Sequence, residues 1–148
     1  MTDKVIVLVT CSKLRECRKI ARHLVAKRLA ACVNITQPVQ SIYRWKEKVE
    51  DEKEYLLLIK STRPLFPEIR KAILTLHSYK VPEVICVPVV DGSQAYLQWL
   101  GESVKHPEPE TEVVPGAEPE PLVNPPGCSH TSTGRFSPAD LAAVQTLR

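Results

Sequence analysis

The residues that can build a hydrophobic core stop about two-thirds of the way along this chain. Seven of its eight aromatic residues lie before position 105, whereas eight of its 13 prolines lie after it. A segment with one aromatic residue and so much proline buries too little apolar surface to offset the entropy of ordering it. We therefore predict a folded domain over 1–104 and a disordered Pro/Glu-rich tail over 105–148, in which 138–147 has the pattern of a short helix.

The two regions carry opposite charge. Residues 1–104 contain 17 Lys and Arg against 11 Asp and Glu, while 105–148 contain three against six. In the folded region the basic residues are interleaved with acidic ones, which is typical of a solvated surface and does not indicate nucleic-acid binding.

Other features of the composition bear on location. No apolar run approaches the 18 or so residues of a membrane span, and the first residues lack the long apolar core of a signal peptide. The five cysteines form no Cys-x-x-Cys pair and are interpreted as reduced thiols. We predict no membrane insertion and a cytoplasmic location.

Apolar periodicity in the first region alternates between that of strands and that of helices. The expected order is a strand over 5–9, a helix over 14–29, a strand over 31–35, a long strand over 39–49, a turn over 50–52, a strand over 55–59, a helix over 62–77, a strand over 84–90 and a final helix after 91. Asp91 and Gln94 have the spacing of a capping box for that last helix. Pro88 places its strand at a sheet edge or a bulge.

This order predicts an α+β fold of the ferredoxin-like type, with a long β-hairpin and a C-terminal helix. Its helices lie on one face of an antiparallel sheet and leave the other face bare. Apolar residues point both ways from the strands over 5–9 and 55–59, so the bare face needs a cover. A domain of this size has no spare element, and we expect a second copy of the chain to supply it.

Catalytic patterns are absent from the folded region. It has two glycines, Gly92 and Gly101, and no phosphate-binding loop, and its only histidines are His23 and His77. We predict that the protein is not an enzyme. His77, Glu83 and Cys86 would together make a borderline ligand set for copper or zinc. The alternative is that His77 caps a helix, Glu83 pairs with a lysine and Cys86 is a small apolar residue.

Four large aromatic residues come in two pairs, Tyr43 with Trp45 and Tyr96 with Trp99. At strand and helix spacing such residues are more typical of packing or of an interface than of a cofactor site. Lys60 directly follows an apolar strand and is a candidate for lining a pocket.

Together these segments resemble the CutA family of divalent-cation-tolerance proteins. The resemblance rests on Leu29-Ala30-Ala31-Cys32-Val33-Asn34, Ser41-Ile42-Tyr43-Arg44-Trp45, Glu54 with Lys60-Ser61-Thr62, His77-Ser78-Tyr79-Lys80-Val81-Pro82-Glu83 and Tyr96-Leu97-Gln98-Trp99-Leu100. It implies a tight homotrimer whose hairpins extend onto neighbouring subunits. It also implies binding of copper or another divalent cation or, in animal members, a role in anchoring acetylcholinesterase.

The resemblance also assigns site residues. His77, Tyr79 and Glu83 match the family's cleft motif, with Ser78 where the family usually has proline. Val9 stands where some bacterial members have a copper-binding cysteine. Cys11, a further cleft-lining candidate, lies two positions on, where we expect it to point differently.

These observations lead to one hypothesis and one alternative. The hypothesis is a non-enzymatic homotrimer that binds Cu²⁺ or another divalent cation through the predicted cleft. The alternative is a trimeric scaffold or assembly protein without a metal function, such as the acetylcholinesterase-associated role, whose tails contact partner proteins.

Overall fold

The computed structural model of the protein describes residues 1–106. The predicted tail from residue 107 onward, including the helix over 138–147, lies outside this range. The elements in chain order are β1 (Lys4–Cys11), α1 (Leu14–Ala26), β2 (Cys32–Ile35), β3 (Val39–Trp45), β4 (Lys48–Thr62), the 3₁₀ turn η1 (Arg63–Leu65), α2 (Phe66–Leu76), β5 (Ile85–Pro88) and α3 (Gln94–Ser103).

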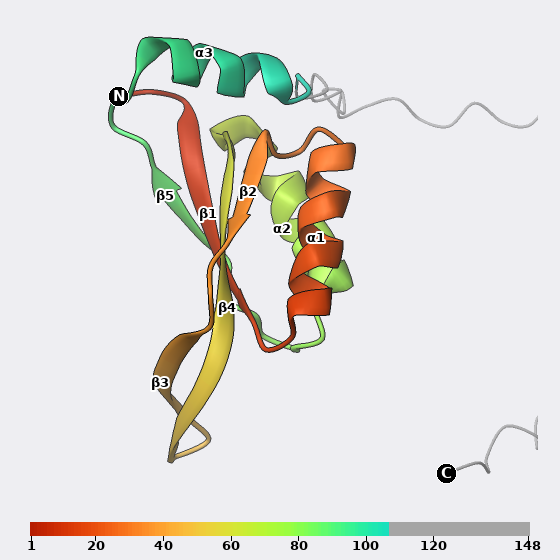
Figure 1. Ribbon diagram of the computed structural model, residues 1–148, viewed down its shortest axis with the longest axis vertical. Helices are drawn as coiled ribbons and strands as arrows, with labels where there is room; N and C mark the ends of the chain where they lie inside the picture. The colour runs from red at the N-terminus through yellow and green to blue at the C-terminus, as the bar shows by residue number, and fades with distance from the viewer. Residues whose placement is uncertain (107–148) are drawn as a thin grey trace, which may run out of the picture. The chain divides into compact units, whose positions relative to one another are not determined.

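The sheet is antiparallel, with the order β2-β4-β1-β5, and β3 pairs with the first half of β4. Helices α1 and α2 cover one face of it, α3 lies across one end, and the β3–β4 hairpin extends beyond the other end (Figure 1). The predicted ferredoxin-like α+β fold with a long hairpin and a C-terminal helix is confirmed. Pro88 ends the edge strand β5, where its missing N–H disrupts no further pairing.

The helix-covered face of the sheet holds the core. Alternate residues of β1 point toward the helices, and all four of them are at most 1% exposed: Val5, Val7, Val9 and Cys11. Cys11 therefore shares a face with Val9, and the expectation that it points differently was wrong, because residues two apart on a strand lie on the same side. Apolar residues of β4 and both helices complete the core: Leu57, Ile59, Ile20, Leu24, Ile69 and Ile73.

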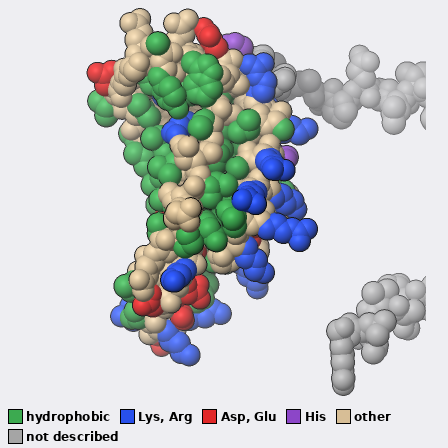
Figure 2. Space-filling model, in the orientation of Figure 1, with side chains coloured by type: hydrophobic (Ala, Val, Ile, Leu, Met, Phe, Trp, Pro, Cys, Tyr) green, Lys and Arg blue, Asp and Glu red, His purple; other side chains and the backbone are tan. Residues whose placement is uncertain are grey.

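The opposite face of the sheet is apolar as well, but it lacks such a cover. Its members alternate with the core residues on three neighbouring strands: Ile6, Leu8, Leu56, Leu58, Ile85 and Val87. Ile85 and Val87 are 48% and 40% exposed. Figure 2 shows hydrophobic side chains gathered on the side of the molecule away from α1. We call this surface the open face.

The hairpin turn was predicted at 50–52 but lies at Lys46 and Glu47. Both residues have positive φ, 45° and 67°, which is typical of a two-residue type I′ turn. This turn matches the twist of the two strands, so β4 runs unbroken through the acidic segment and pairs Asp51 with Ile42. The prediction of a turn at 50–52 relied on the acidic composition of that segment and was therefore wrong.

Helix α1 ends at Ala26, three residues before its predicted end. Arg28 takes a left-handed conformation, with φ of 55°, and the N–H groups of Leu29 and Ala30 both donate to the carbonyl oxygen of Leu24. These bonds satisfy the Leu24 carbonyl in the last turn of the helix and reverse the chain toward β2. The apolar spacing continues past this end because Leu29 and Ala30 still face the core.

The predicted capping box at α3 does not form. The N-cap is Ser93, whose side chain makes no capping hydrogen bond, and Asp91 instead accepts a hydrogen bond from the N–H of Gly92. Within residues 1–106, no helix combines the length and apolar character needed to cross a membrane.

Candidate metal centre

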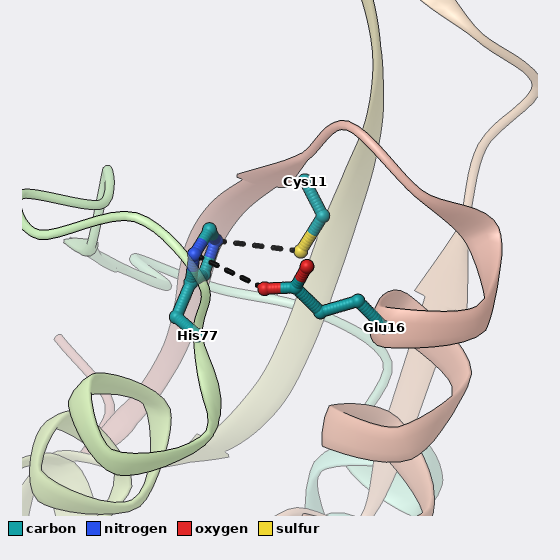
Figure 3. A group of neighbouring side chains, drawn as sticks. All are labelled: Cys11, Glu16 and His77. Carbon is teal, nitrogen blue, oxygen red and sulfur yellow. Dashed lines mark hydrogen bonds and ion pairs between the residues drawn. The ribbon is translucent and has the colours of Figure 1, made fainter. Parts of the chain in front are cut away.

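Three potential ligand side chains meet at one end of the covered face. Cys11 is the last residue of β1, Glu16 lies in the first turn of α1, and His77 directly follows α2. One ligand atom from each lies within 4.8 Å of the others (Figure 3). Because β1 leads directly into α1 and α2 packs beside α1, the fold brings together residues 66 positions apart.

The hydrogen bonds of His77 define its tautomer. Its Nε2 lies 2.8 Å from the carbonyl oxygen of Thr10 and 3.5 Å from the Sγ of Cys11, while its Nδ1 accepts from the N–H of Tyr79 at 3.0 Å. A carbonyl oxygen only accepts and a backbone N–H only donates, so these two contacts assign a proton to Nε2 and a lone pair to Nδ1. Its side chain is fully buried.

Glu16 holds the segment that carries the histidine. Its Oε1 accepts from the N–H of Ser78 at 2.6 Å, its Oε2 accepts from the Ser78 hydroxyl at 2.9 Å, and Oε1 lies 3.2 Å from the Nδ1 of His77. A proline at position 78 would lack both donors. In this chain the serine therefore links the loop after α2 to the first turn of α1.

The thiol of Cys11 is held in its neutral form. Burial raises its pKa well above the ordinary value, and the neighbouring Cys17 thiol and the carboxylates of Glu16 and Glu54 act in the same direction. A metal ion binds the thiolate, so binding at Cys11 must release a proton.

A second pair extends the polar cluster onto β4. The hydroxyl of Tyr79 donates to the Oε1 of Glu54 at 3.1 Å, and its ring centroid lies 4.9 Å from that of His77. Glu54 is only 5% exposed, and burial raises the pKa of the Tyr79 hydroxyl. The tyrosine thus connects the histidine to a buried carboxylate.

The structure brings together three of the predicted site residues, namely His77, Tyr79 and Cys11. Glu83 is exposed and, within residues 1–106, makes no hydrogen bond or ion pair with them. Lys60 lies elsewhere, on the open face, where its Nζ donates to the side chain of Asn34.

Two residues of the cluster, Glu16 and Glu54, were not among the predicted site residues. Glu16 did carry a signal, because it is the single acidic residue between Asp3 and Glu47 and stands in a strongly basic helix.

The two predicted aromatic pairs lie on the surface of the subunit. Tyr43 and Trp45 are on β3, with the Tyr43 hydroxyl donating to Glu52, and Tyr96 and Trp99 are on α3, with ring centroids 5.4 Å apart. All four are 37–48% exposed. Their predicted role in an interface between subunits stays a prediction.

These features define an α+β protein of the ferredoxin-like type with a cysteine–glutamate–histidine cluster at one end of its sheet. The family model described as CutA1 divalent ion tolerance protein matches residues 5–103. The chain belongs to this family.

Relatives match over nearly the same range. The "Divalent-cation tolerance protein CutA" of Thermus thermophilus is 44% identical over 98 residues, which cover 66% of this chain and 95% of that protein. The human "Protein CutA" is 40% identical over 107 residues. The chain spans 60% of the human protein's length and 52% of the mouse protein's.

Solved structures of the family share the fold. A Thermus thermophilus divalent cation tolerance protein superposes with a TM-score of 0.67 at 42% identity, covering 69% of this chain and 99% of that one. CutA from Xylella fastidiosa superposes with a TM-score of 0.68 at 36% identity, covering 70% and 100%.

Proposed function

We propose that this protein binds a divalent cation, copper or a similar ion, and acts in cation tolerance by binding rather than by catalysis. One observation carries the proposal, namely the meeting of Cys11, Glu16 and His77 within 4.8 Å. The relatives from Thermus thermophilus and Archaeoglobus fulgidus, both named divalent-cation tolerance proteins, support it.

The donor set fits such an ion. Thiolate, imidazole and carboxylate together favour copper or zinc over magnesium or calcium. The 3.5 Å between His77 Nε2 and Cys11 Sγ is close to the roughly 3.5 Å expected between a nitrogen and a sulfur ligand of one tetrahedral ion. Nε2 can bind a metal ion only after it loses its proton. When that proton moves to Nδ1, Nδ1 stops accepting from the N–H of Tyr79 and donates instead to the Glu16 carboxylate, 3.2 Å away.

The predicted cleft of His77, Tyr79 and Glu83 is retained in part. His77 is the proposed ligand. In the metal-free protein Tyr79 is held beside it by an N–H bond to the ring and by a hydroxyl bond to Glu54, and the second bond does not depend on the histidine tautomer. Glu83 is exposed within one subunit, so we propose a role for it only where a neighbouring subunit completes the cleft.

Calorimetric titration of Cu²⁺ and Zn²⁺ into the full chain and into His77→Ala tests the proposal. We expect His77→Ala to weaken binding at least tenfold. His23→Ala, a half-buried histidine on α1, is the matched control and should stay within twofold. Equal heats in all three proteins, or none in any, would exclude the metal centre. With Co²⁺ as a probe, a thiolate charge-transfer band that disappears in Cys11→Ser would identify the sulfur ligand.

We also propose that the subunits associate as a homotrimer through the open face and the exposed aromatic pairs. The support is physical, because the apolar residues of β1, β4 and β5 on that face would otherwise contact water. Sedimentation equilibrium of the full chain should give three times the 16.6 kDa of one subunit. A mass of 16.6 kDa would contradict the trimer.

We propose a cytoplasmic location because the cysteines of the described region are free thiols. Among residues 1–106, the four cysteines Cys11, Cys17, Cys32 and Cys86 form no disulfide, which suits a reducing compartment. Relatives are named as chloroplastic in Arabidopsis thaliana and periplasmic in Archaeoglobus fulgidus, so the family occupies more than one compartment. Cell fractionation with an antibody to the natural protein tests this; recovery with organelles or outside the cell would contradict it.

A further inference from the structure

The outward surface of α1 carries a concentration of unneutralised positive charge, so the expected interleaving of basic and acidic residues does not hold on this helix. Arg15, Arg18, Lys19 and Arg22 are all exposed, and within residues 1–106 none of them makes an ion pair or a side-chain hydrogen bond. The only acidic residue of the helix, Glu16, is turned to Ser78 instead. Figure 2 shows the Lys and Arg side chains gathered over this helix.

This arrangement works against the helix itself. Arg15 with Lys19 and Arg18 with Arg22 are like charges four residues apart, a spacing that destabilises a helix by about 0.2–0.5 kcal/mol per pair. Arg15 also lies in the first turn, at the positive end of the helix dipole. Because nothing among the described residues offsets these costs, the charge pattern is better explained by a ligand than by stability.

The same residues line a shallow groove of about 540 Å³. Leu14, Arg18 and Arg22 form one ridge at four-residue spacing, and Arg15 and Lys19 form the next. At 1.5 Å per residue the groove follows the helix for about 12 Å. The groove is lined mostly by carbon, from Leu14 and the stems of the four basic side chains. Because the four charges are spread along the helix, a ligand that contacts all of them must be elongated.

We propose that this α1 groove binds a short linear polyphosphate, either free or as the triphosphate of a nucleotide. Three of its four cations are arginines, whose planar guanidinium groups match phosphate oxygens in pairs. Successive phosphates lie close enough for several of them to contact the cations of one helix. The proposal does not depend on the metal centre, since the groove contains none of Cys11, Glu16 and His77.

Calorimetric titration of inorganic tripolyphosphate into the metal-free full chain tests the inference. We expect binding that weakens at least tenfold in the double variant Arg18→Gln/Arg22→Gln. Lys48→Gln/Lys53→Gln, on the distant β3–β4 hairpin, changes net charge by the same amount and should stay within twofold. Thermal melting of the arginine variant should show stability that is unchanged or higher, because like-charge repulsion is removed.

Two further ligands are compared with tripolyphosphate. ATP tests whether the phosphates can come from a nucleotide, and a glutamate peptide tests whether carboxylates can replace them. If ATP binds as tightly as tripolyphosphate, with the same loss in the arginine variant, the groove accepts the triphosphate of a nucleotide. If ATP does not bind, the ligand is free polyphosphate. A pentaglutamate peptide should bind at least tenfold more weakly than tripolyphosphate. Equal binding of the peptide, equal loss in both double variants, or no binding of tripolyphosphate to the unchanged protein would overturn the inference.

Discussion

The two faces of the sheet are built from the same strands but differ in how deeply their apolar side chains are buried. On the covered face, Leu57 and Ile59 of β4 are fully buried by helices of their own subunit. On the open face, Leu56 and Leu58 of the same strand are only half-buried. Hydrophobic content therefore does not distinguish the faces; the supply of helices does.

The difference shows what a domain of about 100 residues can and cannot complete alone. Two helices suffice for one side of a sheet of this width, and α3 lies across only one end of it (Figure 1). The cluster of Cys11, Glu16 and His77 lies where the covered face ends, at the last residue of β1. Substitutions that alter one face at a time therefore test whether burial on one face depends on the other.

The largest effect is expected from a charge on the open face. In Leu58→Glu, a trimer would have to bury three unpaired carboxylates, each at a cost of several kcal/mol. We expect the mass in sedimentation equilibrium to fall from three subunits to one. Leu74→Glu, at a 52% exposed position on α2, is the control and should leave the mass unchanged. A trimer that persists in Leu58→Glu would show that the open face is not its interface.

A smaller effect is expected from a cavity on the covered face. Ile59→Ala removes a fully buried side chain and should lower the free energy of unfolding by about 2–5 kcal/mol in urea denaturation. Its mass should stay unchanged, in contrast to Leu58→Glu one position away. If Ile59→Ala dissociates the subunits as well, the two faces are coupled through the sheet and are not independent.

Local patterns were sufficient to predict most of the fold. The three helices, the edge position of Pro88 and the two-faced apolar strands all follow from periodicity and the limits on proline. The turn at Lys46 and Glu47 and the early end of α1 did not, because both depend on non-glycine residues with positive φ. Neither sequence position carries a glycine to mark it.

The site was harder to predict because its members come together only in three dimensions. His77 was recognised, but its partner Glu16 lies on another helix, at a spacing of 61 residues that no local pattern reveals. Glu83 was predicted from the cleft motif and from its short distance in sequence to His77. Within one subunit it lies at an exposed position, and its part in the site stays a prediction. Sequence identifies which residues have suitable chemistry, whereas helix packing determines which of them meet.

The smallest expected effect concerns pH and compares one thiol from each face. Burial raises the pKa of Cys11 above its ordinary value of 9.0, so the folded protein keeps this group protonated where the unfolded chain ionises. The resulting stability is fully present below pH 9 and is lost as the pH rises above it, by at most about 1.4 kcal/mol per pH unit. Cys17 and Tyr79, whose pKa values burial also raises, act with the same sign.

Urea denaturation at pH 8, 9 and 10 should therefore show a falling free energy of unfolding in the unchanged protein. The fall should be shallower in Cys11→Ala, whatever the variant's stability at pH 8. Cys32→Ala, which removes a half-exposed thiol of the open face, should keep the original slope. If Cys11→Ala keeps the slope of the unchanged protein, the alkaline destabilisation does not arise from this thiol. The closed environment inferred for Cys11 would then be wrong.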